Sequence, residues 1–509
     1  MPIILSLLSL LPIVSLLGCL IGFKLSVPKA GAVSLAAALI VAFGFFGLTA
    51  FGLLVASLKA LWLALFVSLI VWGALLLYHA MDDFGAVGVI NKNISALAGD
   101  RFFAFVLLSW LFTGLLQGIA GFGVPAVIVA PILTALGYDP VKSLAAALLG
   151  HSWAITFGSM GTAFFVIQGI TGIPETELGV PMWIFNTCAH LMTGAGVCWI
   201  YGGLDGLKKA PAYILPVSAA MAAAQYFTIR FGMYSLAAIN ASLAGLAVMF
   251  ALYRLRAKDG RFGGFYKDKL NLFQALLPYA LILALLLLFQ FVPAGVRDAV
   301  AAAPDFPATE TAEGYIVGAE LGYNKIRLFS HPGFALFAGV AAACAVYRRA
   351  GVWDPGVFRG AAKKTLKKGV PATLALLALG NMSLVMMDAG MMYRLAKAAA
   401  EAAGRAYPLI SPFIGVLASF LTGNNTNSNV MFGMFQYETA KELGVSGAVM
   451  AAAQSISAAV GCAVGPTLIL MGAVAAKQEG KESLILKKLL PYVLIIAFVM
   501  GALNFILLH

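Results

Sequence analysis

Apolar runs as long as membrane-spanning helices follow one another along almost the whole chain of 509 residues, and no polar stretch is long enough for a soluble domain. A bilayer core about 30 Å thick needs about 20 apolar residues per helix, and a helix satisfies its backbone polar groups within one segment. The sequence therefore predicts an all-α polytopic membrane protein with about twelve transmembrane helices. The predicted spans are 3–22, 31–57, 60–80, 141–165, 183–203, 211–229, 232–254, 271–292, 332–347, 370–388, 446–474 and 490–508.

The composition favours one membrane unit over residues 1–509 rather than several soluble domains. Hydrophobic residues make up 61% of the chain and charged residues only 11%, whereas soluble domains contain about 25% charged residues. The 33 Lys and Arg exceed the 21 Asp and Glu, and they gather between apolar runs, as basic residues do in cytoplasmic loops. Topology thus explains the net charge, and no nucleic-acid partner is expected.

Two basic clusters, 254–269 and 348–368, set the predicted orientation. Both should be cytoplasmic, because Lys and Arg are retained on that side during insertion. The loop 293–331 between them carries five acidic residues and falls outside, as do both chain ends. The chain is therefore predicted to be a multi-pass protein of the cell inner (plasma) membrane.

Motifs for covalent chemistry are missing from the sequence. The five cysteines form no CxxC pair, so no zinc site or disulfide framework is indicated, and no cofactor or metal is expected. An intramembrane enzyme would need a nucleophile with a base, or metal ligands, within its spans. No HExxH, GxSxG or Walker A motif is present, so neither an enzyme nor an ATP-driven pump is expected.

A weak internal repeat relates the first third of the chain to the last. A shift of 307 residues places Gly158 on Gly465 (465 − 158 = 307), and the apolar segments around them agree. Span 60–80 and its partner 370–388 cross in opposite directions, so the repeat is an inverted-topology repeat, which is typical of secondary transporters. The predicted units are repeat 1 at 60–175, repeat 2 at 365–480 and the intervening helices of 176–364.

Each predicted repeat contains an apolar segment that is too long for one span and is interrupted in the middle. Segment 102–138 holds the glycine-rich stretch 117–125, and segment 408–440 holds a run of amides and hydroxyls at 422–429. Gly costs about 1 kcal/mol and Pro about 3 in a helix interior, and amides in hydrocarbon must line a cavity. Each segment is predicted to be a re-entrant helical hairpin.

A hairpin tip directs a helix amino terminus at the membrane midplane, where N–H groups and the helix dipole favour an anion such as a carboxylate. Pro125 suits the first turn after the first tip, and Ser428 or Asn429 can cap the helix after the second. The alternative is that the glycines allow close packing and the second stretch is a solvated loop. The predicted substrate-binding tip residues are Gly121, Phe122, Gly123, Gly423, Asn424, Asn425, Thr426, Asn427, Ser428 and Asn429.

His151 lies near the middle of span 141–165, where an ionisable side chain is costly. It either donates a structural hydrogen bond or acts in transport, by binding a carboxylate or carrying a coupling proton. We take it as a substrate-binding and proton-coupling candidate. Asp82, Asp83 and Asp388 lie at predicted span boundaries, where solvated or capping roles are expected.

Three phrases carry a family resemblance: GFGVPAVIVAPILTALGYDP at 121–140, FGSMG at 157–161, and TGNNTNSN at 422–429 followed by VMFGMFQ. In these phrases, and in its helix pattern, the chain resembles the lactate permease family, bacterial carriers of L-lactate, D-lactate and glycolate that are thought to couple uptake to protons. The resemblance also implies kinship with elevator-type anion carriers, whose hairpins move with the substrate against a fixed scaffold.

The chain departs from the family pattern at two places. The family has an Asp in the second hairpin where this chain has Asn425, and an Asn-Thr pair near 150–152 where this chain reads Gly150-His151-Ser152. The hairpin therefore lacks a carboxylate that could carry the proton. The coupling ion and the choice of anion are left open.

The predicted function is secondary active transport of a small organic anion, a 2-hydroxymonocarboxylate such as lactate or glycolate, coupled to H⁺ by alternating access. The alternative is a Na⁺-coupled carrier of another carboxylate or a sulfonate, with Asn424–Asn427 holding the cation. The third hypothesis is that the chain forms a channel. The lipid bilayer is an expected partner. The sequence is also compatible with a homo-oligomer but does not specify one.

Overall fold

The computed structural model describes residues 2–23, 25–96, 101–119, 124–256, 269–290, 292, 296, 299–327, 331–478 and 480–509. The α-helices are α1 Pro2–Leu17, α2 Val27–Phe45, α3 Ala50–Asp83, α4 Ala86–Ala96, α5 Arg101–Val106, α6 Thr113–Ile119, α7 Val124–Ala135, α8 Pro140–Gly150, α9 Gly158–Thr171, α10 Glu175–Lys209, α11 Pro211–Arg230, α12 Ala237–Arg256, α13 Leu272–Gln290, α15 Pro332–Arg349, α16 Pro355–Asp388, α17 Met391–Ala403, α18 Tyr407–Thr422, α19 Asn425–Glu442, α20 Gly447–Gly461, α21 Pro466–Ala475 and α22 Glu482–Leu508. Short π or 3-10 segments adjoin them: η1 Gly18–Gly22, η2 Leu107–Phe112, η3 Ser152–Ala154, η4 Tyr234–Leu236, η5 Gly404–Ala406 and η6 Cys462–Val464.

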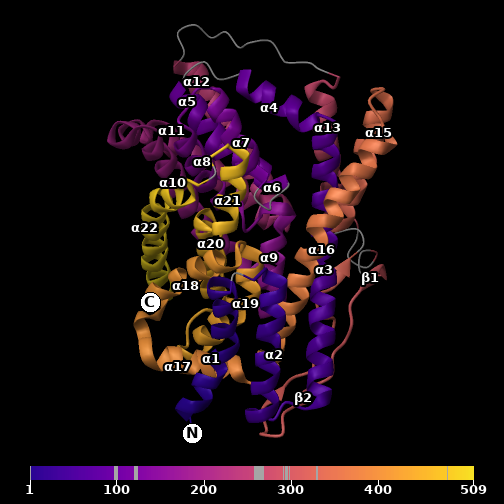
Figure 1. Ribbon diagram of the computed structural model, residues 1–509, viewed down its shortest axis with the longest axis vertical. Coiled ribbons are helices and arrows are strands. Elements are labelled where there is room, and N and C mark those ends of the chain that lie inside the picture. Colours follow the sequence, from indigo (N-terminus) through magenta and orange to yellow (C-terminus); the bar gives the residue numbers. More distant parts are fainter. Residues whose placement is uncertain are drawn as a thin grey trace.

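The described residues form a bundle of apolar helices (Figure 1). Eight of these helices are long and apolar enough to cross a membrane, or nine if the bent pair α8 and α9 counts as one span. The all-α polytopic membrane fold is therefore confirmed, while the number of twelve spans stays a prediction. Figure 1 shows the N-terminus and β2 at one end of the molecule, and the carboxyl ends of α12 and α15 at the other.

The predicted spans 31–57 and 60–80 do not match the helices. The first helix ends earlier, as α2, and α3 then runs unbroken for 34 residues. The chain turns at Gly47, whose φ of 65° suits glycine, and Thr49 caps α3 by accepting a hydrogen bond from Gly52 N at 3.0 Å. Lys59, which falls between the two predicted spans, is fully buried inside α3.

Helices α3 and α16 pack along each other in opposite directions, and ion pairs join them near both ends. Near one end, Lys59 of α3 lies 3.7 Å from Asp388, the last residue of α16. At the other, Lys364 of α16 pairs with Asp83, the last residue of α3. Helices α2 and α15 also pack on this pair. Asp388 is buried, so the prediction of a solvated or capping residue there is wrong.

A second group of helices packs beside this one. Helices α18, α20 and α22 contact one another, α10 packs on α20, and α11 packs on α10 and α12. Helices α9 and α19 contact each other, and they also touch α3 and α16 respectively. The two groups therefore meet largely through α9 and α19, which also border the candidate site.

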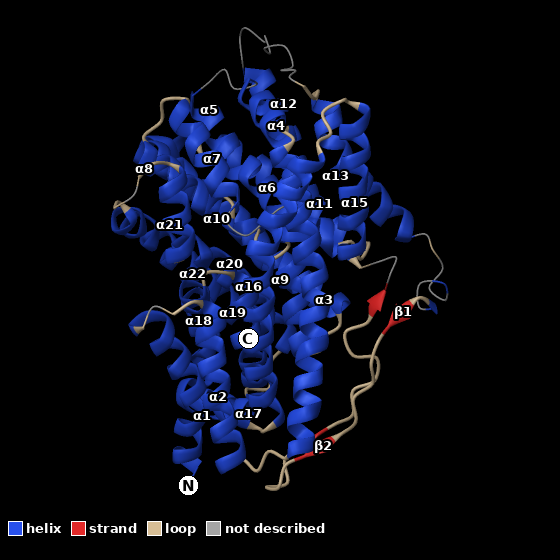
Figure 2. Cartoon of the chain, turned by 45° about the vertical axis from the view of Figure 1, so that its right-hand side comes forward, coloured by secondary structure: helices blue, strands red, loops and turns tan. Residues whose placement is uncertain are grey.

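Residues 299–327, which we call the strap, lie beside α3 (Figure 2). They form two small antiparallel pairs, β1 Ala301–Ala302 with β4 Ile326–Arg327 and β2 Thr309–Glu310 with β3 Ile316–Val317. Glu320 of the strap accepts a hydrogen bond from Lys59 Nζ at 2.7 Å, and the carbonyl of Asn324 accepts one from Trp62 Nε1 at 3.0 Å. The predicted acidic loop is thus fixed against the long helix.

The order of elements from α3 to α9 recurs from α16 to α21. Helices α3 and α16 each contain 34 residues. Each is followed by a shorter helix (α4 or α17), an interrupted helical segment (α5–α7 or α18–α19) and a helix that ends in a 3-10 turn (α8 or α20). A further short helix, α9 or α21, ends the series.

At Gly150, α8 passes close to the backbone of η2. A Cβ at this position would lie 1.8 Å from the carbonyl oxygen of Ser109, a backbone atom that cannot move without its helix. Gly150→Ala is therefore expected to destabilise the fold by about 2 kcal/mol or more, which would lower the melting temperature of the purified protein. The matched control is Gly380→Ala, where a Cβ meets nothing within 4 Å and should be neutral or stabilising. Equal melting temperatures would contradict the close approach.

Candidate functional site

The turn between α18 and α19 places a helix amino terminus inside the molecule. Gly423 ends α18 with a φ of 76°, a conformation that favours glycine. Asn424 then adopts an extended conformation, and its side-chain oxygen accepts a hydrogen bond from Asn427 N at 2.8 Å. Asn424 is thus the N-cap of α19, and the prediction that Ser428 or Asn429 caps this helix is wrong. The first N–H groups of an 18-residue helix lie at this point.

The predicted span 141–165 is broken, and α8 and α9 are bent by 53° relative to each other. After His151 and η3 the chain makes a left-handed turn at Ser159, Met160 and Gly161, with φ values of 47°, 57° and 80°. Two non-glycine residues in this region store strain of about 1–3 kcal/mol each, which is typical of functional sites. The turn lies in the FGSMG phrase, and Thr162 Oγ1 donates a hydrogen bond to Ser159 O at 2.7 Å.

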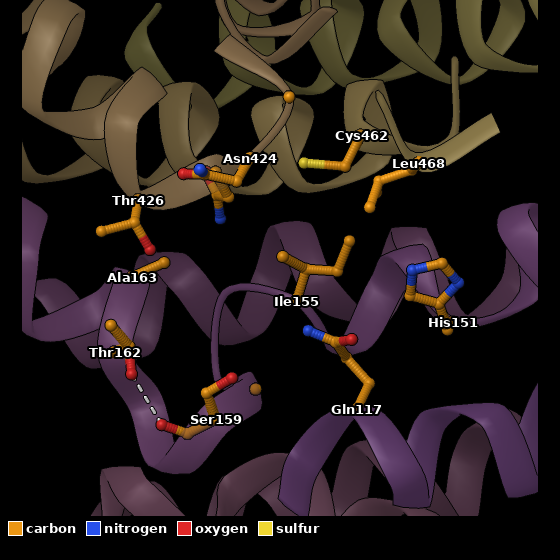
Figure 3. Close-up of a pocket in the computed structure, with 13 residues that line it drawn as sticks. Gln117, His151, Ile155, Ser159, Thr162, Ala163, Asn424, Thr426, Cys462 and Leu468 are labelled. Carbon is orange, nitrogen blue, oxygen red and sulfur yellow. Dashed lines mark hydrogen bonds between the residues drawn. The ribbon is translucent and has the colours of Figure 1, made fainter. Parts of the chain in front are cut away.

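A cavity of about 40 Å³ lies between these two breaks, with room for roughly three water molecules. Figure 3 shows Asn424, Cys462 and Leu468 on one side of it, and Gln117, His151 and Ser159 on the other. The two sides come from the carboxy-terminal and amino-terminal parts of the chain. None of the lining residues that the structure describes is Asp, Glu, Lys or Arg, so only polar groups and helix ends are available to an ion.

The structure brings part of the predicted site together. His151, Gly423, Asn424, Asn425 and Thr426 all line the cavity. Pro125 lies in the first turn of α7, as expected. Asn427, Ser428 and Asn429 are buried in α19 but do not line the cavity. Gly121, Phe122 and Gly123 lie outside the described residues.

His151 is fully buried and presents one unpaired nitrogen. Its Nδ1 lies 2.7 Å from the carbonyl oxygen of Ala147, which can only accept, so Nδ1 carries a hydrogen. Nε2 then has a lone pair in the neutral ring, and it has no hydrogen-bond partner within the part of the chain that the structure describes. Among the lining residues that the structure describes, this imidazole and the Cys462 thiol are the ionisable side chains.

A network of neutral side chains fixes the tip of α19 against its neighbours. Asn425 Nδ2 donates to Thr156 Oγ1 at 3.0 Å, and Thr156 Oγ1 lies 3.1 Å from Ser455 O. Asn429 Nδ2 donates to Ser455 Oγ at 2.9 Å, and Gln454 Nε2 donates to Ser428 Oγ at 3.2 Å. Gln454 and Ser455 therefore make interhelical bonds and do not line the cavity.

The sequence interpretation missed two residues of this site as functional candidates. Gln117, the first residue of the glycine-rich stretch 117–125, lines the cavity, and its Oε1 has no hydrogen-bond partner among the described residues. Thr156 lies in the break between α8 and α9 and holds Asn425. The offset of 307 contained a signal for Gln117, because it places this residue on Asn424 (424 − 117 = 307). No local pattern marks Thr156.

His190 lies away from the cavity. Its Nε2 is 3.3 Å from Asn186 Nδ2, which also donates to Gln225 Oε1 at 3.0 Å. Its ring packs edge-on against Trp153 with 4.6 Å between the centroids. These contacts place it in a buried polar cluster between α10 and α11.

A family model described as L-lactate permease matches residues 5–509. The L-lactate permease of Escherichia coli (strain K12) is 26% identical over 541 aligned residues, which cover 98% of this chain and 95% of that protein. The glycolate permease GlcA of the same organism is 23% identical, with 97% and 94% covered. The solved YdaH transporter of Alcanivorax borkumensis aligns over 86% of this chain and 84% of its own with a TM-score of 0.43 and 14% identity, which is too distant to carry an argument.

The matched model covers nearly all of the sequence, and it confirms the resemblance drawn from the hairpin and FGSMG phrases. A permease family with several long apolar helices also fits the predicted multi-pass protein of the inner membrane. The chain belongs to the L-lactate permease family.

Proposed function

We propose that this chain is a secondary active carrier, not an enzyme, which takes up a 2-hydroxymonocarboxylate such as lactate or glycolate together with H⁺ by alternating access. The printed names of its relatives, an L-lactate permease and a glycolate permease, support the substrate class. The observation that carries the proton coupling is the unpaired, buried Nε2 of His151 at a cavity without fixed charge.

In the neutral imidazole, Nε2 carries a lone pair and no hydrogen. It cannot hydrogen-bond to a carboxylate, because the carboxylate oxygens are also acceptors. Protonation turns Nε2 into a donor, and the imidazolium then offers a charge-assisted hydrogen bond. The first N–H groups of α19, at Asn425 and Thr426, favour the same anion from the other side of the cavity.

Burial explains why the two ions move together. An anion alone in this cavity would be an uncompensated buried charge, and an imidazolium alone would be one too. The loaded pair is neutral, and so is the empty site with a neutral ring. Only these two forms can then cross the membrane, which is the condition for symport.

On this proposal, alternating access occurs when the group of helices that contains the cavity moves relative to α3 and α16. Contact between the two groups runs largely through α9 and α19. We further propose that the segments α3–α9 and α16–α21 are inverted repeats, each containing a hairpin that is re-entrant in the bilayer. The recurring order of elements supports this assignment.

The two ion pairs between α3 and α16 give independent support for the inverted repeats. Lys59 and Lys364 lie 305 residues apart (364 − 59), and so do Asp83 and Asp388 (388 − 83). Each pair joins the lysine of one helix to the last residue of the other. A twofold axis in the membrane plane would exchange the two pairs, as inverted repeats require.

A second candidate function is Na⁺-coupled transport of another small carboxylate or a sulfonate. One observation favours it: Gln117 and Asn425 both line the cavity, and their amide oxygens have no hydrogen-bond partner within the described part of the chain. Uncharged oxygens of this kind coordinate Na⁺ in transporters with broken helices.

Uptake into proteoliposomes separates these functions. Labelled L-lactate or glycolate should accumulate when the lumen is made alkaline, and replacing Na⁺ by choline should leave the rate unchanged. A requirement for Na⁺ would favour the second candidate. Uptake should saturate and show counterflow, which a channel would not. No uptake of any small monocarboxylate or sulfonate would overturn both functions.

A further inference from the structure

In the hydrogen-bond network behind the cavity, the donor and acceptor roles of the side chains are fixed. Asn429 Nδ2 lies 3.0 Å from Ala163 O and 2.9 Å from Ser455 Oγ. A backbone carbonyl only accepts, so this amide group must present its NH₂ to both partners. The single hydrogen of Thr156 Oγ1 is likewise directed to Ser455 O at 3.1 Å.

These roles decide how Asn425 is oriented. With its hydrogen donated to Ser455 O, Thr156 Oγ1 has only lone pairs left for Asn425, 3.0 Å away. Asn425 must therefore point its Nδ2 at Thr156. Its Oδ1 faces elsewhere, and this buried oxygen has no hydrogen-bond partner among the residues that the structure describes. Asn425 itself lines the cavity and is 1% exposed. The reverse orientation would cost Thr156 its bond to Ser455 O.

A buried carbonyl oxygen without a donor is costly, and a ligand that supplies the donor removes that cost. A carboxylate brings only acceptors. In a 2-hydroxy acid, however, a hydroxyl donor lies one carbon from the carboxylate. Asn425 is the first residue of α19, so its side-chain oxygen lies beside the N–H groups that favour a carboxylate. The acceptor, Asn425 Oδ1, is thus adjacent to the N–H donors of α19, just as the hydroxyl of a 2-hydroxy acid is adjacent to its carboxylate.

We propose that Asn425 Oδ1 accepts the hydrogen bond of the substrate 2-hydroxyl, an inference that rests on the proposed function. Thr156 is then the positioning residue that keeps this oxygen facing the cavity. Asn425 is then the residue that distinguishes lactate from propionate and glycolate from acetate. Among the described lining residues, Gln117 also has an amide oxygen, Oε1, without a hydrogen-bond partner. Gln117 sits on the opposite wall from Asn424 (Figure 3), away from the amino terminus of α19.

The test compares each 2-hydroxy acid with its parent acid within one variant, so that a partly unfolded preparation does not alter the ratio. Apparent affinities come from the ligand-dependent rise in melting temperature of the purified full-length protein. The unaltered protein should prefer lactate over propionate by roughly 10- to 100-fold. Asn425→Ala should reduce this ratio to about 3-fold or less, mainly by weakening lactate.

Thr156→Val removes the hydroxyl at nearly constant volume and frees the Asn425 amide to rotate, so the ratio should fall while propionate binding is kept. Thr156→Ser keeps the hydroxyl and should restore the ratio, which a merely structural role for the methyl group would not do. Gln117→Ala should leave the ratio as it is.

Two outcomes would overturn the inference. The first is an unchanged ratio in Asn425→Ala, which includes an equal loss of affinity for both acids, and the second is a collapse of the ratio in Gln117→Ala instead. Lactate binding without preference over propionate in the unaltered protein would overturn the inference and leave the proposed carrier standing. Stabilisation by neither acid would count against the proposed function itself.

Discussion

Replacing His151 by glutamine is expected to abolish both accumulation driven by a pH gradient and exchange of the anion across the membrane, while leaving weak binding of the anion. Glutamine keeps a donor for the carboxylate but cannot take up a proton, so the loaded site becomes an uncompensated buried anion. Net H⁺-driven uptake should fall to the background of empty vesicles. Counterflow should be lost as well, because the charged loaded site cannot cross. Binding, measured by the ligand-dependent rise in melting temperature, should persist with an affinity reduced roughly 10- to 100-fold, because a hydrogen bond from a charged group is replaced by one from a neutral amide.

The matched control for this variant is His190→Gln. His190 is equally buried, but it does not line the cavity, and glutamine can keep its bond to Asn186. Its H⁺-driven uptake should resemble that of the unaltered protein. Full accumulation of lactate by the His151→Gln variant under an imposed pH gradient would show that the proton is carried elsewhere.

Lys59→Met is expected to cause the largest loss of stability. The ammonium group lies 2.7 Å from Glu320 and 3.7 Å from Asp388, and the side chain is 1% exposed. Neither Asp388 oxygen has a hydrogen bond within the described part of the chain, so removing Lys59 leaves a buried carboxylate uncompensated. Breaking such a pair from one side costs about 3–5 kcal/mol. The melting temperature and yield of purified protein should fall sharply, and transport with them.

The structure supplies two controls for the loss of Lys59. Asp388→Asn combined with Lys59→Met removes the orphaned charge and should recover most of the lost stability. Lys364→Met breaks the corresponding pair at the other end of α3, where the lysine side chain is 55% exposed, and it should cost less than about 1 kcal/mol. If Lys59→Met melts no lower than Lys364→Met, the buried ion pair of Lys59 does not stabilise the fold more than the exposed pair does.

The membrane fold and the break between α18 and α19 could be predicted because their causes are local. Twenty apolar residues in sequence leave few alternatives to a helix in lipid. The run TGNNTNSN could not lie in a lipid-facing helix, and the structure ends α18 at Thr422 and starts α19 at Asn425. The choice of Asn424 as the cap was not predictable, because Asn, Ser and Thr all serve at that position.

The missed features depend on partners that are distant in the chain. Lys59 falls in the gap between the predicted spans 31–57 and 60–80, and an isolated lysine is costly in an apolar helix. It is tolerated inside α3 because Glu320 and Asp388 reach it from 261 and 329 residues further along (320 − 59 and 388 − 59). The bend after His151 was missed for another reason. Its left-handed turn contains Ser159 and Met160, residue types that do not signal a positive φ.

A cavity wall without fixed charge has a consequence for the energetics of the cell. Moving one elementary charge across a membrane potential of 100 mV changes the free energy by about 2.3 kcal/mol. The lining that the structure describes contains no Asp, Glu, Lys or Arg, and on the proposed coupling both the empty and the loaded site are neutral. The voltage across the membrane then neither drives nor opposes either half of the cycle. Net direction is set by the concentrations of protons and anion alone, so the carrier exports its substrate as readily as it imports it whenever those concentrations reverse.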